Sequence, residues 1–254
     1  MTMPRLNDSN MEFGTIGGMK GFGFSGIRVE HLGATEYTLV TIAVDVTGSV
    51  DGFENELRRC LIAMVMSCKR SPRSDNLLLR VILFASRFNG GVYEVHGFKL
   101  LIDIDPQKEY AQLTTGGGTP LFDACYSAIG AMNEYGKKLA DDDFGVNAIA
   151  VIITDGDNTH SAATEAMIKE AMKQGVSGEI LESMLSILIG INAAMYKNEL
   201  ENFQRNAGIT QYIDAGDVTE GKLARLAEFV SQSITSQSQA LGTGGPSQNI
   251  SVTI

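Results

Sequence analysis

Residues 40–49 read Val40-Thr41-Ile42-Ala43-Val44-Asp45-Val46-Thr47-Gly48-Ser49, an apolar run that ends in a polar turn. A run of this length with few polar residues predicts a central strand that is covered on both faces. Strands of this kind belong to parallel sheets flanked by helices. The turn that follows would then lie beyond the carboxyl end of the strand, where open α/β sheets place their binding sites.

Strand and helix patterns alternate along nearly the whole chain on either side of this segment. The predicted strands are 26–32, 37–44, 77–85, 92–95, 98–104, 148–154, 184–191 and 210–214. The predicted helices are 53–69, 120–139, 162–174, 193–206 and 218–236. The alternation predicts an α/β protein of Rossmann-like, doubly wound type, with a mainly parallel central sheet and helices on both faces.

The two ends of the chain lack this pattern. We interpret the glycine-rich residues 1–26 as an extended or mobile arm before a domain of residues 27–236. The arm contains a GxGxxG sequence at 21–26, but a dinucleotide site needs a strand before it and a helix after it, and neither is predicted. Residues 237–254 are interpreted as a Ser/Gln/Gly-rich linker. The alternation in 249–254 fits an edge strand, a segment that adds to a partner's sheet, or a frayed terminus.

Composition narrows the classes of partner. The 254 residues include 30 acidic and 20 basic ones, a net charge of -10, which argues against nucleic acid because phosphate binding needs a basic surface. The sequence shows no signal peptide and no apolar run that would span a bilayer, so we expect a cytoplasmic protein without a membrane partner. The three cysteines lack metal-binding spacing and fall in apolar helical patterns, which predicts packed, reduced thiols.

Oxygen-bearing side chains gather where three predicted loops meet the carboxyl edge of the sheet. Asp45, Thr47 and Ser49 follow the first central strand, Thr119 precedes the helix that starts at 120, and Asp155 follows strand 148–154. Carboxylates and hydroxyls are hard donors that suit Mg²⁺, Ca²⁺ or Mn²⁺. Because few of these donors are charged, a bound metal would stay electrophilic and take a further carboxylate from outside. The sequence therefore predicts a divalent-metal site.

This order of donors, Asp-x-Thr-x-Ser followed by a distant threonine and a distant aspartate, resembles the metal-ion-dependent adhesion site (MIDAS) of von Willebrand factor A (VWA) domains. The flanking segments 42–45, 117–121 and 151–156 are also similar, and the resemblance covers about residues 37–233. Thr47 stands where the family has serine, and keeps the hydroxyl. The resemblance implies a VWA fold with one antiparallel edge strand. It also implies that the three hydroxyls ligate the metal and that the aspartates do so directly or through water.

The same resemblance implies a binding module and no enzyme. In such a module Mg²⁺, or alternatively Ca²⁺ or Mn²⁺, bridges to an Asp or Glu of a protein partner. The chain is similar to intracellular bacterial or phage members of the family, which often serve as assembly or regulatory subunits. The expected partner is an AAA+ ATPase or another subunit of a stress or defence system.

Other functions make different demands on the same residues. A phosphohydrolase of the haloacid dehalogenase type begins with Asp-x-Asp after its first strand, and here Thr47 replaces the second aspartate, which is the general acid. No Gly-Lys-Ser/Thr is present for a P-loop. A secreted adhesin is disfavoured because no signal peptide is found.

Structural roles are the alternatives for single residues. Asp45 or Ser49 would cap the following helix, and Asp155 would shape its turn. Asp123 fits the helix dipole. His160 either lines the rim of the site or, as we expect, is a surface loop residue. Asp157 either touches a water beyond the direct ligands or is an exposed turn carboxylate.

Overall fold

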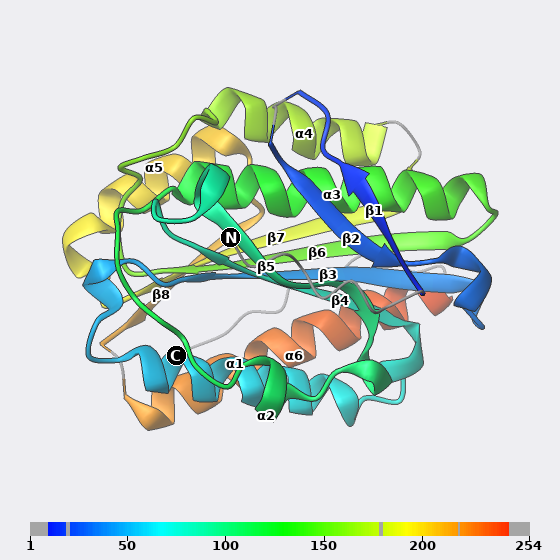
Figure 1. The fold of residues 1–254 in the computed structure, drawn as a ribbon, viewed down its shortest axis with the longest axis horizontal. Helices are drawn as coiled ribbons and strands as arrows, with labels where there is room; N and C mark the ends of the chain where they lie inside the picture. The colour runs from blue at the N-terminus through cyan, green and yellow to red at the C-terminus, as the bar shows by residue number, and fades with distance from the viewer. Residues whose placement is uncertain (1–9, 19–20, 178–179, 218, 244–254) are drawn as a thin grey trace.

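The computed structural model describes residues 10–18, 21–177, 180–217 and 219–243. A sheet of eight strands lies between two layers of helices (Figure 1). The strands are β1 (Met11–Thr15), β2 (Gly23–Ile27), β3 (Glu36–Asp45), β4 (Leu77–Phe84), β5 (Val92–Leu100), β6 (Gly145–Thr154), β7 (Ser183–Ile191) and β8 (Gln211–Gly216). The helices are α1 (Glu54–Lys69), α2 (Pro106–Glu109), α3 (Leu121–Asp141), α4 (Glu165–Ser177), α5 (Lys197–Ala207) and α6 (Glu220–Thr243).

The strand order is β1-β2-β5-β4-β3-β6-β7-β8. From β4 to β8 the neighbours pair in parallel, whereas β5 is antiparallel to β4. The predicted α/β architecture, with a mainly parallel sheet, helices on both faces and an antiparallel strand towards one edge, is therefore confirmed. The short α2 was not predicted.

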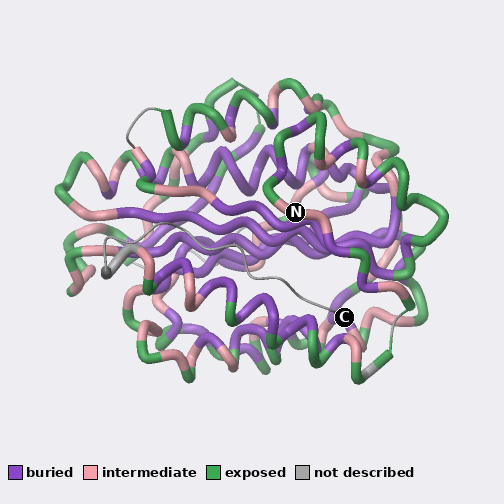
Figure 2. The backbone as a smooth tube through the Cα atoms, turned by 180° about the vertical axis from the view of Figure 1, so that it is seen from behind, coloured by how far each residue is buried: buried purple, intermediate pink, exposed green. Residues whose placement is uncertain are grey.

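The central strands are buried on both faces, as their apolar sequences require. Every residue of β4 is buried, and so is every residue of β3 after Glu36. Alternate residues of β3 enter different cores: Val40, Ile42 and Val44 pack with α1 and α6, while Leu39 and Ala43 pack with α3. The backbone coloured by burial shows the sheet as a buried layer and the outer helix surfaces as exposed (Figure 2).

The interpretation of residues 1–26 as an arm outside the domain is wrong for the part that the structure describes. β1 and β2 form an antiparallel hairpin, and β2 joins the sheet in parallel with β5 through Gly26 and Phe98. The hairpin is held by apolar packing, because the ring of Phe24 lies edge-on to those of Phe98 and Tyr135. It extends the sheet by two strands beyond β5.

Close backbone approach explains the glycines of this region. A Cβ at Gly26 would come within 2.8 Å of the Tyr135 ring, and one at Gly97 would collide with the backbone of Ser25. Glycine is therefore required for the hairpin to dock, although its frequency suggested a mobile segment. The strand predicted at 26–32 is wrong beyond Ile27, where β2 ends, and a short 3-10 turn, Val29–His31, follows.

Two further boundaries differ from the predictions. The strands predicted at 92–95 and 98–104 are one strand, β5, with register shifts against β4 on both sides of Val81. The linker predicted from residue 237 is wrong as far as residue 243, because α6 continues to Thr243. Tertiary contacts hold this polar end of α6. The backbone carbonyl of Gln237 accepts a hydrogen bond from the side chain of Asn147, and the side-chain amide of Gln237 donates to the hydroxyl of Ser183. Residues 249–254 lie outside the described residues.

The three cysteines, Cys60, Cys68 and Cys125, are free and buried, as predicted. Within the described part of the chain, the helices are too short or too polar to cross a membrane.

Candidate metal centre

Three loops converge at the carboxyl edge of β3 and β6. The loop after β3 is tied to the loop before α3 by two backbone bonds: Gly48 N to Gly117 O at 3.0 Å and Gly116 N to Val46 O at 3.0 Å. The loop after β6 is tied to the same segment by Thr159 N, which donates to Thr119 O at 2.9 Å. The structure therefore brings together the three loops that carry the predicted ligands.

Asp45 is the last residue of β3, and its side chain is buried. Its Oδ1 accepts from the backbone N of Thr47 at 2.9 Å, and its Oδ2 accepts from the hydroxyl of Thr154 at 2.7 Å. Both carboxylate oxygens are thus oriented by donors on two neighbouring strand ends. Asp45 and Ser49 do not cap α1, because its N-cap is Phe53 and no side-chain cap bond is present there.

Hydroxyl contacts link Thr47, Ser49 and Asp155. Ser49 Oγ donates to Asp155 Oδ1 at 2.8 Å and lies 3.0 Å from Thr47 Oγ1. Thr47 is buried, whereas Ser49 is exposed and opens the group to solvent. Thr119 is buried against Gly156, where a Cβ would lie 4.0 Å from its Oγ1. All five predicted residues therefore lie at one site.

The setting disfavours the charged form of both carboxylates. Burial, and then the nearby Asp155, raise the pKa of Asp45 to about 6. Burial likewise raises the pKa of Asp155, and the bond from Ser49 works in the opposite direction. Neither carboxylate has a lysine or arginine partner among the residues that the structure describes. A divalent cation would supply the missing positive charge, so the donor set fits such an ion.

The donor set is poor in charge. Over the described ranges, no three His, Cys, Asp or Glu side chains gather closely enough to hold a metal by themselves. This centre instead offers two carboxylates and three hydroxyls, all hard oxygen donors. The two carboxylates would at most neutralise a bound divalent ion, and the three hydroxyls would add no charge, so the ion could still accept a carboxylate from another molecule.

Residues that orient the predicted ligands could not be identified from the sequence, because their roles depend on tertiary contacts. Thr154 orients Asp45, and Thr159 Oγ1 accepts from the backbone N of Thr119 at 2.9 Å. Asp123, assigned above to the dipole of α3, is in the first turn of that helix and also accepts from the backbone N of Ala162 and Ala163, at 3.0 and 2.7 Å. It therefore braces the loop that carries Asp155.

His160 and Asp157 both lie in the loop after β6, which also carries Asp155. His160 is exposed, and its Nδ1 lies 2.7 Å from Thr159 Oγ1. It packs so closely on Gly118 that a Cβ there would collide with its ring. Asp157 is half-buried and accepts from the backbone N of Asn158 at 2.7 Å, as a turn carboxylate does.

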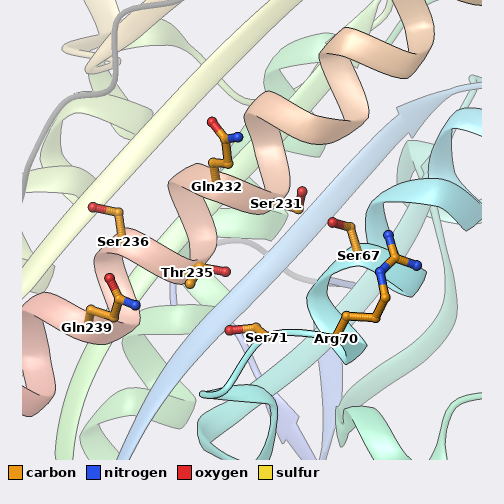
Figure 3. Close-up of a pocket in the computed structure, with 8 residues that line it drawn as sticks. All are labelled: Ser67, Arg70, Ser71, Ser231, Gln232, Thr235, Ser236 and Gln239. Carbon is orange, nitrogen blue, oxygen red and sulfur yellow. The ribbon is translucent and has the colours of Figure 1, made fainter.

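A groove of about 400 Å³ lies elsewhere, between the C-terminal end of α1 and α6 (Figure 3). Its lining holds hydroxyls, amides and one guanidinium, and comprises Ser67, Arg70, Ser71, Ser231, Gln232, Thr235, Ser236 and Gln239. Because the lining has no carboxylate, it does not compete with Asp45 and Asp155 as a cation site.

No family model matches the chain, and no curated protein matches its sequence. Solved structures match its fold. The pilus adhesin SpaC from Lactobacillus rhamnosus GG aligns over 92% of this chain and 35% of its own, with 11% identity and a TM-score of 0.58. Proximal thread matrix protein 1 from the mussel byssus, in a structure with a zinc-occupied MIDAS motif, aligns over 80% and 47%, with 16% identity and a TM-score of 0.52. The VWA domain of SpRpn10 aligns over 75% and 93%, with 10% identity and a TM-score of 0.51.

The chain thus spans about a third of the length of the pilus adhesin and about half that of the thread matrix protein, but corresponds to nearly the whole SpRpn10 VWA domain. At identities this low the likeness concerns the fold alone. The strand order, the two helical layers and these alignments agree, and the chain has the fold of a von Willebrand factor A domain.

Proposed function

We propose that this chain is a metal-dependent protein interaction module. Asp45, Thr47, Ser49, Thr119 and Asp155 hold a divalent cation, and the cation binds an aspartate or glutamate carboxylate of a partner protein. When bound, the metal supplies a positive centre with an open coordination position. The chain's own residues position that centre and leave it accessible beside the exposed Ser49.

The observation that carries this proposal is the hydrogen-bonded array at the strand ends. Two carboxylates with raised pKa values share one small site with three hydroxyls and have no basic partner in the described part of the chain. The zinc-occupied MIDAS motif of the mussel thread matrix protein, which has the same fold, supports the assignment of a metal.

We take Mg²⁺ as the resident cation, with Ca²⁺ and Mn²⁺ as alternatives, because all donors are hard oxygens. We also propose that the site performs no catalysis, since position 47 offers a buried hydroxyl in place of the second carboxylate that a phosphohydrolase uses as its general acid. The proposed setting is an intracellular complex, with an AAA+ ATPase or another subunit of a stress or defence system as partner.

The test is affinity capture from cells that express the tagged chain, quantified by mass spectrometry. We expect a set of proteins that is retained in Mg²⁺ and lost both in EDTA and with Asp45→Ala. Asp51→Ala is the matched control, because Asp51 is an exposed carboxylate near the site that lies outside the donor set.

The control variant should retain the same proteins as the wild type. Partners that remain bound in EDTA and with Asp45→Ala would contradict a metal bridge. A phosphoester turnover that disappears with Asp45→Ala would show that the site is catalytic instead.

A further inference from the structure

Two large apolar side chains project into solvent beside the candidate metal centre. Met195 is 87% exposed and Tyr196 is 41% exposed, and both belong to the short 3-10 helix η6 (Ala194–Tyr196). Large apolar residues scattered singly on a surface need no explanation, but adjacent ones next to a binding site often mark an interface. We call this pair the Met195–Tyr196 shelf.

Tyr196 places the shelf beside the loop that carries Asp155. η6 follows β7, which runs parallel to β6, so both strands end at the same edge of the sheet. A Cβ at Gly156 would lie 3.9 Å from Cε2 of Tyr196 and 4.0 Å from Oγ1 of Thr119. Gly156, the residue after Asp155, therefore lies between the ring of Tyr196 and the hydroxyl of Thr119, which is one of the proposed ligands.

The backbone beneath the shelf is fixed, so the exposure of these side chains is a built feature. Ala193 is buried, and Tyr196 N donates to its carbonyl at 2.9 Å. Asn192 has a left-handed conformation, with φ 54°, and its N donates to Gly216 O at 2.8 Å. Lys197, at the start of α5, forms an ion pair with Asp214 at 3.2 Å.

We infer that the Met195–Tyr196 shelf and the metal centre form one docking surface for a partner segment that carries a large apolar residue next to its metal-binding Asp or Glu. This inference rests on the proposed function. The partner's carboxylate would satisfy the cation, while its apolar neighbour would cover the thioether and the ring. Met adapts its shape to different apolar groups, and Tyr combines an apolar face with a polar tip, so both are suited to such a contact.

The test begins with peptide selection. Short random peptides around a fixed aspartate are bound to the wild-type protein in Mg²⁺ and eluted with EDTA. We expect the eluted peptides to be enriched in Leu, Ile, Met or aromatic residues next to the aspartate.

The second step is a double-mutant cycle. Two peptides are titrated by fluorescence anisotropy: a selected peptide, and a matched peptide in which serine replaces the apolar residue next to the aspartate. Each is titrated against the wild type and against Met195→Ser/Tyr196→Ser. The double variant should weaken binding of the apolar peptide by about tenfold or more, and leave the serine peptide unchanged. Circular dichroism and Mg²⁺ binding of the variant should match the wild type.

Ile102→Ser is the matched control, because Ile102 is 80% exposed but follows β5 at the opposite edge of the sheet. It should bind both peptides as the wild type does. EDTA-eluted peptides without an apolar preference would overturn this inference and leave the metal bridge intact. An absence of any EDTA-eluted peptide would overturn both. A concentration-dependent dimer abolished by Met195→Ser/Tyr196→Ser would assign the shelf to a second copy of the chain and also overturn the inference.

Discussion

At the scale of single residues, position 47 carries a hydroxyl where a phosphohydrolase of the haloacid dehalogenase type carries its second aspartate. Thr47 is buried, and its Oγ1 lies 3.0 Å from Ser49 Oγ. Both hydroxyls belong to the proposed donor set. A hydroxyl there supplies a neutral ligand, whereas a carboxylate would reduce the residual charge of the cation. This difference supports our proposal that the site binds a partner and performs no catalysis.

Substitution of this residue should separate the hydroxyl from the shape of the side chain. We predict that Thr47→Ser binds Mg²⁺ with an affinity close to that of the wild type, because the hydroxyl remains. Thr47→Val keeps the shape but loses the ligand, and we expect its affinity to fall by more than about tenfold. Isothermal titration calorimetry with chelator-treated protein measures both, and equal affinities of the two variants would exclude the hydroxyl as a ligand.

His96 provides a prediction that is independent of the metal. It is buried, with Nε2 2.7 Å from Tyr110 Oη and Nδ1 2.9 Å from the carbonyl of Gly97, and burial lowers its pKa to about 4. Because the pKa of this imidazole is about 6.5 in the unfolded chain, protonation at lower pH favours the unfolded state. Stability should therefore fall between about pH 6.5 and pH 4, by about 3 kcal/mol from this group.

Urea unfolding across this pH range, compared with His96→Gln, isolates that contribution from the other titrating groups. The difference in unfolding free energy between the two proteins should change with pH in the window from about 6.5 down to 4. A difference that stays constant over this window would show that His96 titrates alike in both states.

At the scale of elements, an ion pair between a buried arginine and a half-buried glutamate helps to fasten the N-terminal hairpin to the sheet. Arg80 in β4 is fully buried and donates to Glu94 in β5 at 2.6 Å, while Glu94 accepts from the backbone N and the hydroxyl of Ser25 in β2. Arg80 also donates to the carbonyl of Gly23 at 3.3 Å. One carboxylate and one guanidinium therefore connect three strands.

Removal of the carboxylate should expose the cost of a buried, unpaired arginine. We predict that Glu94→Ala lowers the free energy of unfolding by about 3 kcal/mol. Glu30→Ala, in the exposed pair of Glu30 with Arg28 at 3.9 Å, should change it by less than about 1 kcal/mol. Urea unfolding measures both variants. Equal and small losses would mean that the hairpin is held by packing alone.

The same elements show where sequence patterns fail. Apolar runs in the sequence identified the central strands β3, β4, β6 and β7. A strand that is buried on both faces is apolar along its own length, so neighbouring residues suffice to reveal it. The hairpin was missed since its glycines reflect contact with residues distant in sequence, such as Tyr135 for Gly26. The extension of α6 was missed because Gln237 is held by hydrogen bonds to Asn147 in β6 and Ser183 in β7, which an apolar stripe does not reveal.

At the scale of the whole molecule, topology makes the site predictable. Parallel strands β3 and β6 are neighbours, so loops that are far apart in sequence must meet at their carboxyl ends. The five candidate ligands could therefore be identified from their order and type alone. Thr154, Thr159 and the Met195–Tyr196 shelf could not, because their roles follow from how loops of this chain pack against one another.

We propose that these five residues hold a divalent cation with an open position for an outside carboxylate. Anomalous diffraction from crystals grown with Mn²⁺ and a carboxylate-bearing peptide can locate that cation and its ligands. We predict one strong Mn²⁺ peak bounded by Asp45, Thr47, Ser49, Thr119 and Asp155, with a peptide carboxylate completing its coordination. Fully occupied crystals with no peak at this position, or with a cation enclosed by protein ligands alone, would contradict the claim.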